Sequence, residues 1–201
     1  MGEFKSFYKE VDNRKFNTWC RWTRRLDTYG CGCAHDCKYC YAKSLLNFRG
    51  LWNNRNPAVA DLAKIKKRIS KLPAGAVVRL GGMTDCFQPC ELEHRVTYET
   101  IKLLNEYNIG YLIVTKSHIV ANDEYTSIMR KDLAHIQVTI TTTDDELSAT
   151  YEKASPPSMR IKAVERLQEM GFDVSVRLSP FIPQFVDVDK INAIKCDKIL
   201  I

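Results

Sequence analysis

Short apolar runs alternate with amphipathic segments along most of the chain. In the clearest amphipathic segment Leu62, Ile65, Ile69 and Leu72 share one helical face, and Asp61 stands where an N-cap is expected. Runs rich in β-branched residues predict strands at 26–28, 76–80, 111–114, 136–141, 173–178 and 198–201. Helices are predicted at 62–71, 93–107, 122–133, 157–170 and 187–194, with a helical turn or two at 41–48.

This alternation predicts an α/β fold made of parallel βαβ units. Six strands and five helices fit a partial (β/α)6 barrel, although the pattern alone also allows an open doubly wound sheet. A chain of 201 residues with 45% hydrophobic residues can bury one substantial core, which we expect over residues 27–201. No apolar run approaches the ~20 residues that span a bilayer, and the N-terminus lacks the apolar core of a signal peptide. We therefore expect a cytoplasmic protein without a membrane segment.

The net charge of +6 is concentrated in the first half of the chain. Residues 1–26 show no clean period and form a candidate N-terminal arm in which basic residues alternate with aromatic ones. The expected helix at 62–71 is also strongly basic. Such surfaces suit phosphate contact and base stacking in a nucleic acid, although an ordinary solvated face and a packed arm would have the same composition.

The stretch 27–43 carries the most specific chemical signal. Cys33, Cys37 and Cys40 have the spacing C-x3-C-x2-C, and soft thiolates so close together select an iron–sulfur cluster, zinc or Cu(I). A cubane cluster normally takes four cysteines, so three would leave one iron open to another ligand. Cys31 offers a fourth sulfur, which leaves a structural zinc site as the alternative. A disulfide framework is disfavoured, because eight cysteines in a chain without a signal peptide are typical of an intracellular protein.

The aromatic residues around these cysteines make the pattern more specific. Together with Tyr39, the stretch Tyr-Gly-Cys-x5-Cys-x-Tyr-Cys-Tyr-Ala resembles the cluster motif of the radical S-adenosylmethionine (radical SAM) enzymes, in particular the branch that contains spore photoproduct lyase. The resemblance implies a [4Fe–4S] cluster on Cys33, Cys37 and Cys40, with SAM bound to the open iron. It also implies a reductant such as a flavodoxin or ferredoxin, and it favours the partial barrel over residues 27–201, here without the family's closing helix.

Reactive groups in parallel β/α barrels lie on the loops that follow the strands. The resemblance implies that Gly81, Gly82, Thr84 and Asp85, with Met83-Thr84 replacing the family's usual acidic position, hold the amino group of SAM. It assigns the SAM carboxylate to Lys116. Further cofactor contacts are expected, together with Tyr39, from Thr141, Thr142, Thr143, Arg177 and Ser179. A glycine turn, strand-forming threonines and capping aspartates are the ordinary structural alternatives.

Cys86 and Cys90 are candidate hydrogen donors, because spore photoproduct lyase donates a hydrogen atom from a cysteine near the end of this strand. An auxiliary cluster ligand and an inert buried thiol are the alternatives. Cys20, Cys31 and Cys196 are interpreted as structural. The substrate stays open between a nucleic acid, for example a dipyrimidine lesion, and a peptide or small metabolite. A non-catalytic iron–sulfur or zinc module that binds RNA or a protein is the alternative from another class, and the oligomeric state is not predicted.

Overall fold

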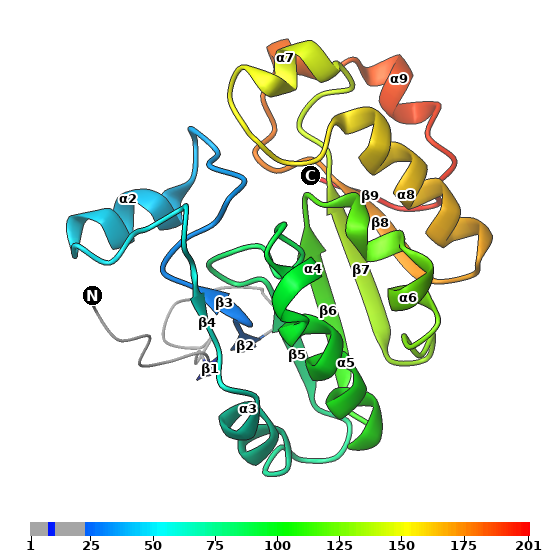
Figure 1. The fold of residues 1–201 in the computed structure, drawn as a ribbon. Coiled ribbons are helices and arrows are strands. Elements are labelled where there is room, and N and C mark those ends of the chain that lie inside the picture. Colours follow the sequence, from blue (N-terminus) through cyan, green and yellow to red (C-terminus); the bar gives the residue numbers. More distant parts are fainter. Residues whose placement is uncertain (1–7, 11–22) are drawn as a thin grey trace.

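The structure is a computed structural model that describes residues 8–10 and 23–201 (Figure 1). Cys20 and most of the basic and aromatic residues of the candidate arm lie outside the described residues. The main sheet has seven strands in the order β1-β2-β5-β6-β7-β8-β9. Their bounds are β1 Tyr8–Glu10, β2 Arg24–Leu26, β5 Val77–Leu80, β6 Gly110–Thr115, β7 Ala134–Thr139, β8 Asp173–Arg177 and β9 Ile199–Leu200. β1 pairs antiparallel with β2, and every other pairing is parallel.

The helices follow the strands in the alternating order that the sequence predicts. They are α2 Tyr41–Phe48, α3 Leu62–Ile69, α4 Glu91–His94, α5 Val96–Glu106, α6 Asp123–Thr126, α7 Asp145–Ala149, α8 Pro157–Glu169 and α9 Val188–Asn192, with 3-10 turns η1 His118–Ala121 and η2 Pro183–Phe185. A second sheet pairs β3 Tyr29–Gly30 with β4 Ala58–Val59. No helix in the part of the chain that the structure describes is long and apolar enough to cross a membrane.

The two faces of the main sheet differ because successive residues of a strand point to opposite sides. Positions such as Val78, Leu80, Ile136 and Val176 are fully or almost fully buried in one apolar core with residues of α3, α5 and α8. The alternate positions on these strands include Arg79, Gln137, Thr139 and Arg177. The sheet is therefore covered by helices on its apolar face, and its other face is mixed, with these polar residues beside Leu112 and Val114 of β6. This arrangement confirms the predicted α/β fold of the partial-barrel type.

Side chains from other elements hydrogen-bond to backbone groups in a segment that was expected to be helical. The helix expected at 122–133 is reduced to the single turn α6, which follows η1. Beyond this turn Asn105 Nδ2 donates to the carbonyl of Ile128 at 2.7 Å, and the Arg130 N–H donates to the hydroxyl of Tyr111 at 3.2 Å. These side chains satisfy backbone groups that a helix would have paired internally. The sequence pattern could not show this, because the partners come from α5 and β6.

The helix expected at 93–107 is divided at Arg95, whose φ of 55° is left-handed. Here the buried carboxylate of Glu91 accepts the N–H groups of Thr97 and Tyr98 at 2.9 and 2.8 Å, so it caps the start of α5. The first parallel strand also begins earlier than predicted, since β2 spans Arg24–Leu26 rather than 26–28, and Tyr29–Gly30 forms β3 rather than a turn.

Candidate functional site

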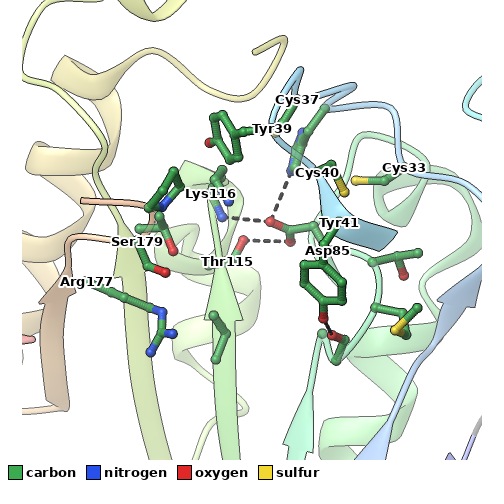
Figure 2. Close-up of a pocket in the computed structure, with 18 of the residues that line it drawn as sticks. Cys33, Cys37, Tyr39, Cys40, Tyr41, Asp85, Thr115, Lys116, Arg177 and Ser179 are labelled. Carbon is green, nitrogen blue, oxygen red and sulfur yellow. Dashed lines mark hydrogen bonds and ion pairs between the residues drawn. The ribbon is translucent and has the colours of Figure 1, made fainter. Parts of the chain in front are cut away.

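A cavity of about 310 Å³ lies between the cysteine loop and the carboxyl ends of β5, β6, β7 and β8 (Figure 2). All three motif cysteines line it. Of the other predicted site residues it is lined by Tyr39, Gly81, Gly82, Thr84, Asp85, Lys116, Arg177 and Ser179. Residues that are as many as 146 positions apart in the chain therefore meet at one place, at the end of the sheet where parallel β/α folds place their reactive groups.

Backbone contacts on both sides hold the cysteine loop in place. On one side the Asn53 N–H donates to the carbonyl of Cys31 at 2.6 Å, and a Cβ on Gly32 would lie only 1.8 Å from the Asn53 oxygen. Only glycine permits so close an approach. On the other side the Lys38 N–H donates to Tyr151 O at 2.8 Å, and the Lys153 N–H donates to the carbonyl of His35 at 2.7 Å. The loop is thus fixed by segments far from it in the sequence.

The three thiols match the donor set of an iron–sulfur centre. Cys33 and Cys37 are buried and Cys40 is half-buried. Burial raises the pKa of Cys33 to about 12 and the pKa of Cys37 to about 11, so both are neutral thiols near pH 7, and binding a metal would displace their protons. Within residues 8–10 and 23–201, no three His, Cys, Asp or Glu side chains are grouped closely enough to hold a single metal ion. The fit to a cluster thus rests on the three soft donors that line one cavity.

A buried ion pair lies next to the motif cysteine Cys37. The Arg160 guanidinium donates to Glu152 Oε1, and both side chains are 0% exposed. The other carboxylate oxygen of Glu152 accepts the hydroxyl of Tyr39 and lies 3.8 Å from Cys37 Sγ. Ser148 Oγ donates to Glu152 as well, at 3.1 Å. A loop carboxylate that no motif singled out thus connects the cluster motif to α8.

Gly81 and the carboxylate of Asp27 fix the conformation of the turn that follows β5. Gly81 has a φ of 75°, and a Cβ there would lie 2.7 Å from the carbonyl oxygen of Val114, so the position requires glycine. The N–H groups of Gly82 and Met83 donate to Asp27 Oδ1 at 2.8 and 3.0 Å. Burial raises the pKa of Asp27 although these N–H groups act in the opposite direction. The turn therefore presents backbone to the cavity in a fixed conformation.

Asp85 links this turn to β6 and to the cysteine loop. It accepts the hydroxyl of Thr115 and the N–H of Lys116, both at 2.7 Å, and lies 3.2 Å from His35 Nε2 (Figure 2). Burial alone would raise the pKa of Asp85, but the charge and hydrogen bond of His35 and the backbone N–H donors lower it to about 2. The neighbouring Thr84 donates its hydroxyl to the carbonyl of Tyr29. The side chains of Asp85 and Thr84 thus connect the turn after β5 to β6, to the cysteine loop and to β3.

Several predicted site residues lie outside the cavity lining. Thr141 is fully buried and shares hydrogen bonds with Tyr151 and Glu152, at 2.8 and 3.4 Å. As far as the described residues go, the lining also lacks Thr142, Thr143, Cys86 and Cys90, whereas Thr139 contributes to it. The hydrogen-donor role of Cys86 and Cys90 stays a prediction, and it would require one of these thiols to reach the cavity.

Residues that sequence reasoning did not select also line the cavity. Tyr41, whose hydroxyl donates to the carbonyl of Gly82 at 2.8 Å, belongs to them together with His35 and Arg79. A signal existed for two of these. Tyr41 directly follows Cys40 within the motif, and Arg79 interrupts an apolar strand two residues before Gly81.

A family model described as the radical SAM superfamily matches residues 28–194. An uncharacterized protein of Methanocaldococcus jannaschii is 29% identical over 168 residues, which cover 80% of this chain and 61% of that protein. An uncharacterized protein of Acidianus two-tailed virus is 26% identical over 172 residues, which cover 77% of this chain and 55% of that protein. The chain thus spans little more than half the length of these relatives.

Solved structures share the fold. Spore photoproduct lyase complexed with dinucleoside spore photoproduct superposes with a TM-score of 0.66 at 15% identity, over 90% of this chain and 51% of that one. Native anSMEcpe with bound AdoMet and Cp18Cys peptide gives a TM-score of 0.52 at 11% identity, over 76% of this chain and 41% of that one.

Proposed function

Because the chain belongs to the radical SAM superfamily, we propose that the protein uses a [4Fe–4S] cluster to cleave SAM reductively and to abstract a hydrogen atom from a nucleic-acid substrate. One observation carries the proposal: the three motif cysteines, the glycine turn and Lys116 line the same cavity at the carboxyl ends of the strands.

The residues at the cavity suit the two cofactors. Cys33, Cys37 and Cys40 would hold the cluster, which when reduced supplies the electron that breaks a sulfonium carbon–sulfur bond of SAM. Lys116, whose ammonium lies 5.5 Å from the ring centroid of Tyr39, is available to pair with the SAM carboxylate on the cysteine side. Gly81 leaves its backbone accessible to the ammonium group of SAM.

The protein's part is to orient the cofactor and to exclude water from the reacting atoms. Tyr39 and Tyr41 stand on either side of Cys40 in the chain and line the cavity beside it. Their hydroxyls are held by Glu152 and by the carbonyl of Gly82. The electron would come from an external reductant, and we propose a flavodoxin or a ferredoxin for this step.

Two features support a nucleic acid as the substrate. The solved structure of the same fold with the higher TM-score holds a dinucleoside lesion. The strongly basic helix α3 also exposes Lys64, Lys66 and Lys67, which suit phosphate contacts.

Anaerobic reconstitution with iron and sulfide tests the proposal. The wild-type protein is expected to turn brown and, with dithionite and SAM, to form 5′-deoxyadenosine. Cys33→Ala, matched with Cys196→Ala as a control far from the motif, should form none. A colourless, zinc-loaded wild type that forms no 5′-deoxyadenosine would refute the proposal. Oligonucleotides with and without ultraviolet lesions, and a peptide panel, then separate the substrate classes by the increase in 5′-deoxyadenosine that each produces.

A further inference from the structure

The charged side chains that line the cavity are mostly positive. Arg79, Lys116 and Arg177 line it, whereas Asp85 is the one carboxylate among its described lining residues. Both oxygens of Asp85 are already engaged, because Oδ1 accepts from Thr115 and Phe87 while Oδ2 accepts from Lys116 N–H and pairs with His35. Asp85 keeps its negative charge in these contacts, so the lining holds three cationic side chains against one carboxylate and carries an excess of positive charge.

A [4Fe–4S]2+ core on three thiolates would carry a net charge of about −1 and would offset about one of these cations. SAM does not account for the rest. Its single carboxylate can pair with one cation, while its sulfonium and ammonium groups bring positive charge of their own. Lys116 is the cation best placed for that carboxylate, since it lies beside Tyr39, two residues after Cys37. A cavity that holds SAM therefore still has Arg79 and Arg177 in its lining as candidates to attract an additional anion.

Arg177 is the stronger candidate of the two. Figure 2 shows its guanidinium extending from the end of β8, below Ser179, on the side of the cavity away from the cysteines. One nitrogen, Nη1, donates to Gln137 Oε1 at 3.2 Å, which is a neutral acceptor, and among the described residues no carboxylate forms a salt bridge with Arg177. Arg79 also lines the cavity, but its charge acts on the buried carboxylate of Asp27.

A planar guanidinium with parallel N–H donors matches the oxygens of a phosphate group. Building on the proposed function, we propose that Arg177 binds a phosphodiester of the nucleic-acid substrate and so places the substrate in the cavity beside SAM. This assignment gives Arg177 a role in substrate binding instead of the cofactor contact that the family resemblance implies.

The test compares two probes that differ in one charge. Calorimetry measures the binding of thymidylyl-(3′→5′)-thymidine and of its uncharged methylphosphonate analogue to wild type, Arg177→Met and Arg177→Lys, each with and without the reconstituted cluster. Wild type should bind the charged dinucleotide about tenfold to a hundredfold more tightly than the analogue. Arg177→Met should lose most of this difference, and Arg177→Lys should keep part of it because it keeps the charge.

Arg130→Met is the matched control, since Arg130 is an exposed arginine that pairs with Asp132 outside the cavity lining. It should bind both probes as wild type does. Equal affinity of wild type for the two probes, or no binding of the dinucleotide, would overturn the proposal. So would an Arg177→Met variant that binds SAM less tightly but keeps its preference for the charged probe, because Arg177 would then serve the cofactor. Formation of 5′-deoxyadenosine without substrate is measured separately, so a failure of radical chemistry is distinguishable from a failure of this subsite.

Discussion

Replacing Arg160 by methionine tests how strongly the buried ion pair behind the cluster motif stabilises the protein. The guanidinium donates to Glu152, to Ser148 Oγ at 3.1 Å, and to the carbonyls of Thr139 at 2.8 Å and Ser155 at 2.6 Å. Methionine has similar length but no charge and no donors. The change therefore leaves the Glu152 carboxylate without its counterion and two carbonyl oxygens without this donor.

Loss of one partner of a fully buried pair costs about 3–5 kcal/mol, because the remaining charge is not solvated. Domains of this size have a free energy of unfolding of about 5–15 kcal/mol, so the loss is a large share of the total. At about 2–4 °C per kcal/mol, the midpoint of thermal unfolding should fall by about 6–20 °C. Urea denaturation of the cluster-free protein under reducing conditions measures the difference directly.

Arg166→Met on the same helix is the matched control. Arg166 is 46% exposed and pairs with Asp123, which is 87% exposed, so its loss should cost at most about 1 kcal/mol. The double variant Arg160→Met/Glu152→Gln should recover part of the stability, because it removes the stranded charge. If Arg160→Met costs no more than Arg166→Met, the buried pair does not stabilise the fold as argued here.

The pH dependence of the stability provides an independent test of the same ion pair. Burial alone would raise the pKa of Glu152, but the charge of Arg160 and hydrogen bonds from Tyr39 and Arg160 lower it. A carboxyl with a lowered pKa stabilises the wild type above its unfolded pKa of about 4.3, and this contribution is lost as the pH falls further. Without Arg160 burial should raise the pKa of Glu152 instead. The stability gap between wild type and Arg160→Met should therefore narrow as the pH is lowered toward 4.

Two further changes address the site itself. Alanine at any one of the cluster-motif cysteines should remove most of the bound iron, whereas Cys31→Ala should retain it; iron content and 5′-deoxyadenosine yield are the measurements, and an iron-poor Cys31→Ala would contradict the ligand set. Asp85→Asn should be less stable than wild type at neutral pH, because the pKa of Asp85 is lowered to about 2. Its stabilising contribution is complete above about pH 4 and is lost as the pH falls toward 2, so the two melting temperatures should converge in acid; a constant gap from pH 7 to pH 3 would refute this reasoning.

Much of the fold was predictable because strand periodicity is local. Six parallel strands are found in the sheet as predicted, the first of them two residues earlier than expected. Asp61 caps α3 as expected, with its carboxylate accepting the N–H groups of Ala63 and Lys64. The segment 122–133 was not predictable in this way, since its apolar residues fit a helix while side chains of α5 and β6 satisfy its backbone. The sequence pattern contains the helical period but not these distant hydrogen-bond partners.

The candidate site shows the same division between local and distant information. The cysteine spacing and the glycine turn lie in short contiguous patterns, and Lys116 is implied by the family resemblance, so all three are accessible from the sequence. Glu152 is not, since it stands in a loop 113 residues from Tyr39, the motif residue whose hydroxyl it accepts. Nothing near Glu152 in the sequence marks it as a contact of the cysteine motif.

This non-local support has a physical consequence for the cysteine loop. The loop forms no regular element between β3 and α2, so its own backbone hydrogen bonds cannot fix the positions of its thiols. The segment 148–155 supplies the missing contacts, through the carbonyl of Tyr151, the N–H of Lys153 and the carboxylate of Glu152. Arg160 of α8 holds Glu152 in place. A change that destabilises the packing of α8 should therefore also shift the positions of the motif thiols. Variants that weaken this pair are therefore expected to lose iron before they lose secondary structure, since local opening of a loop costs less than global unfolding.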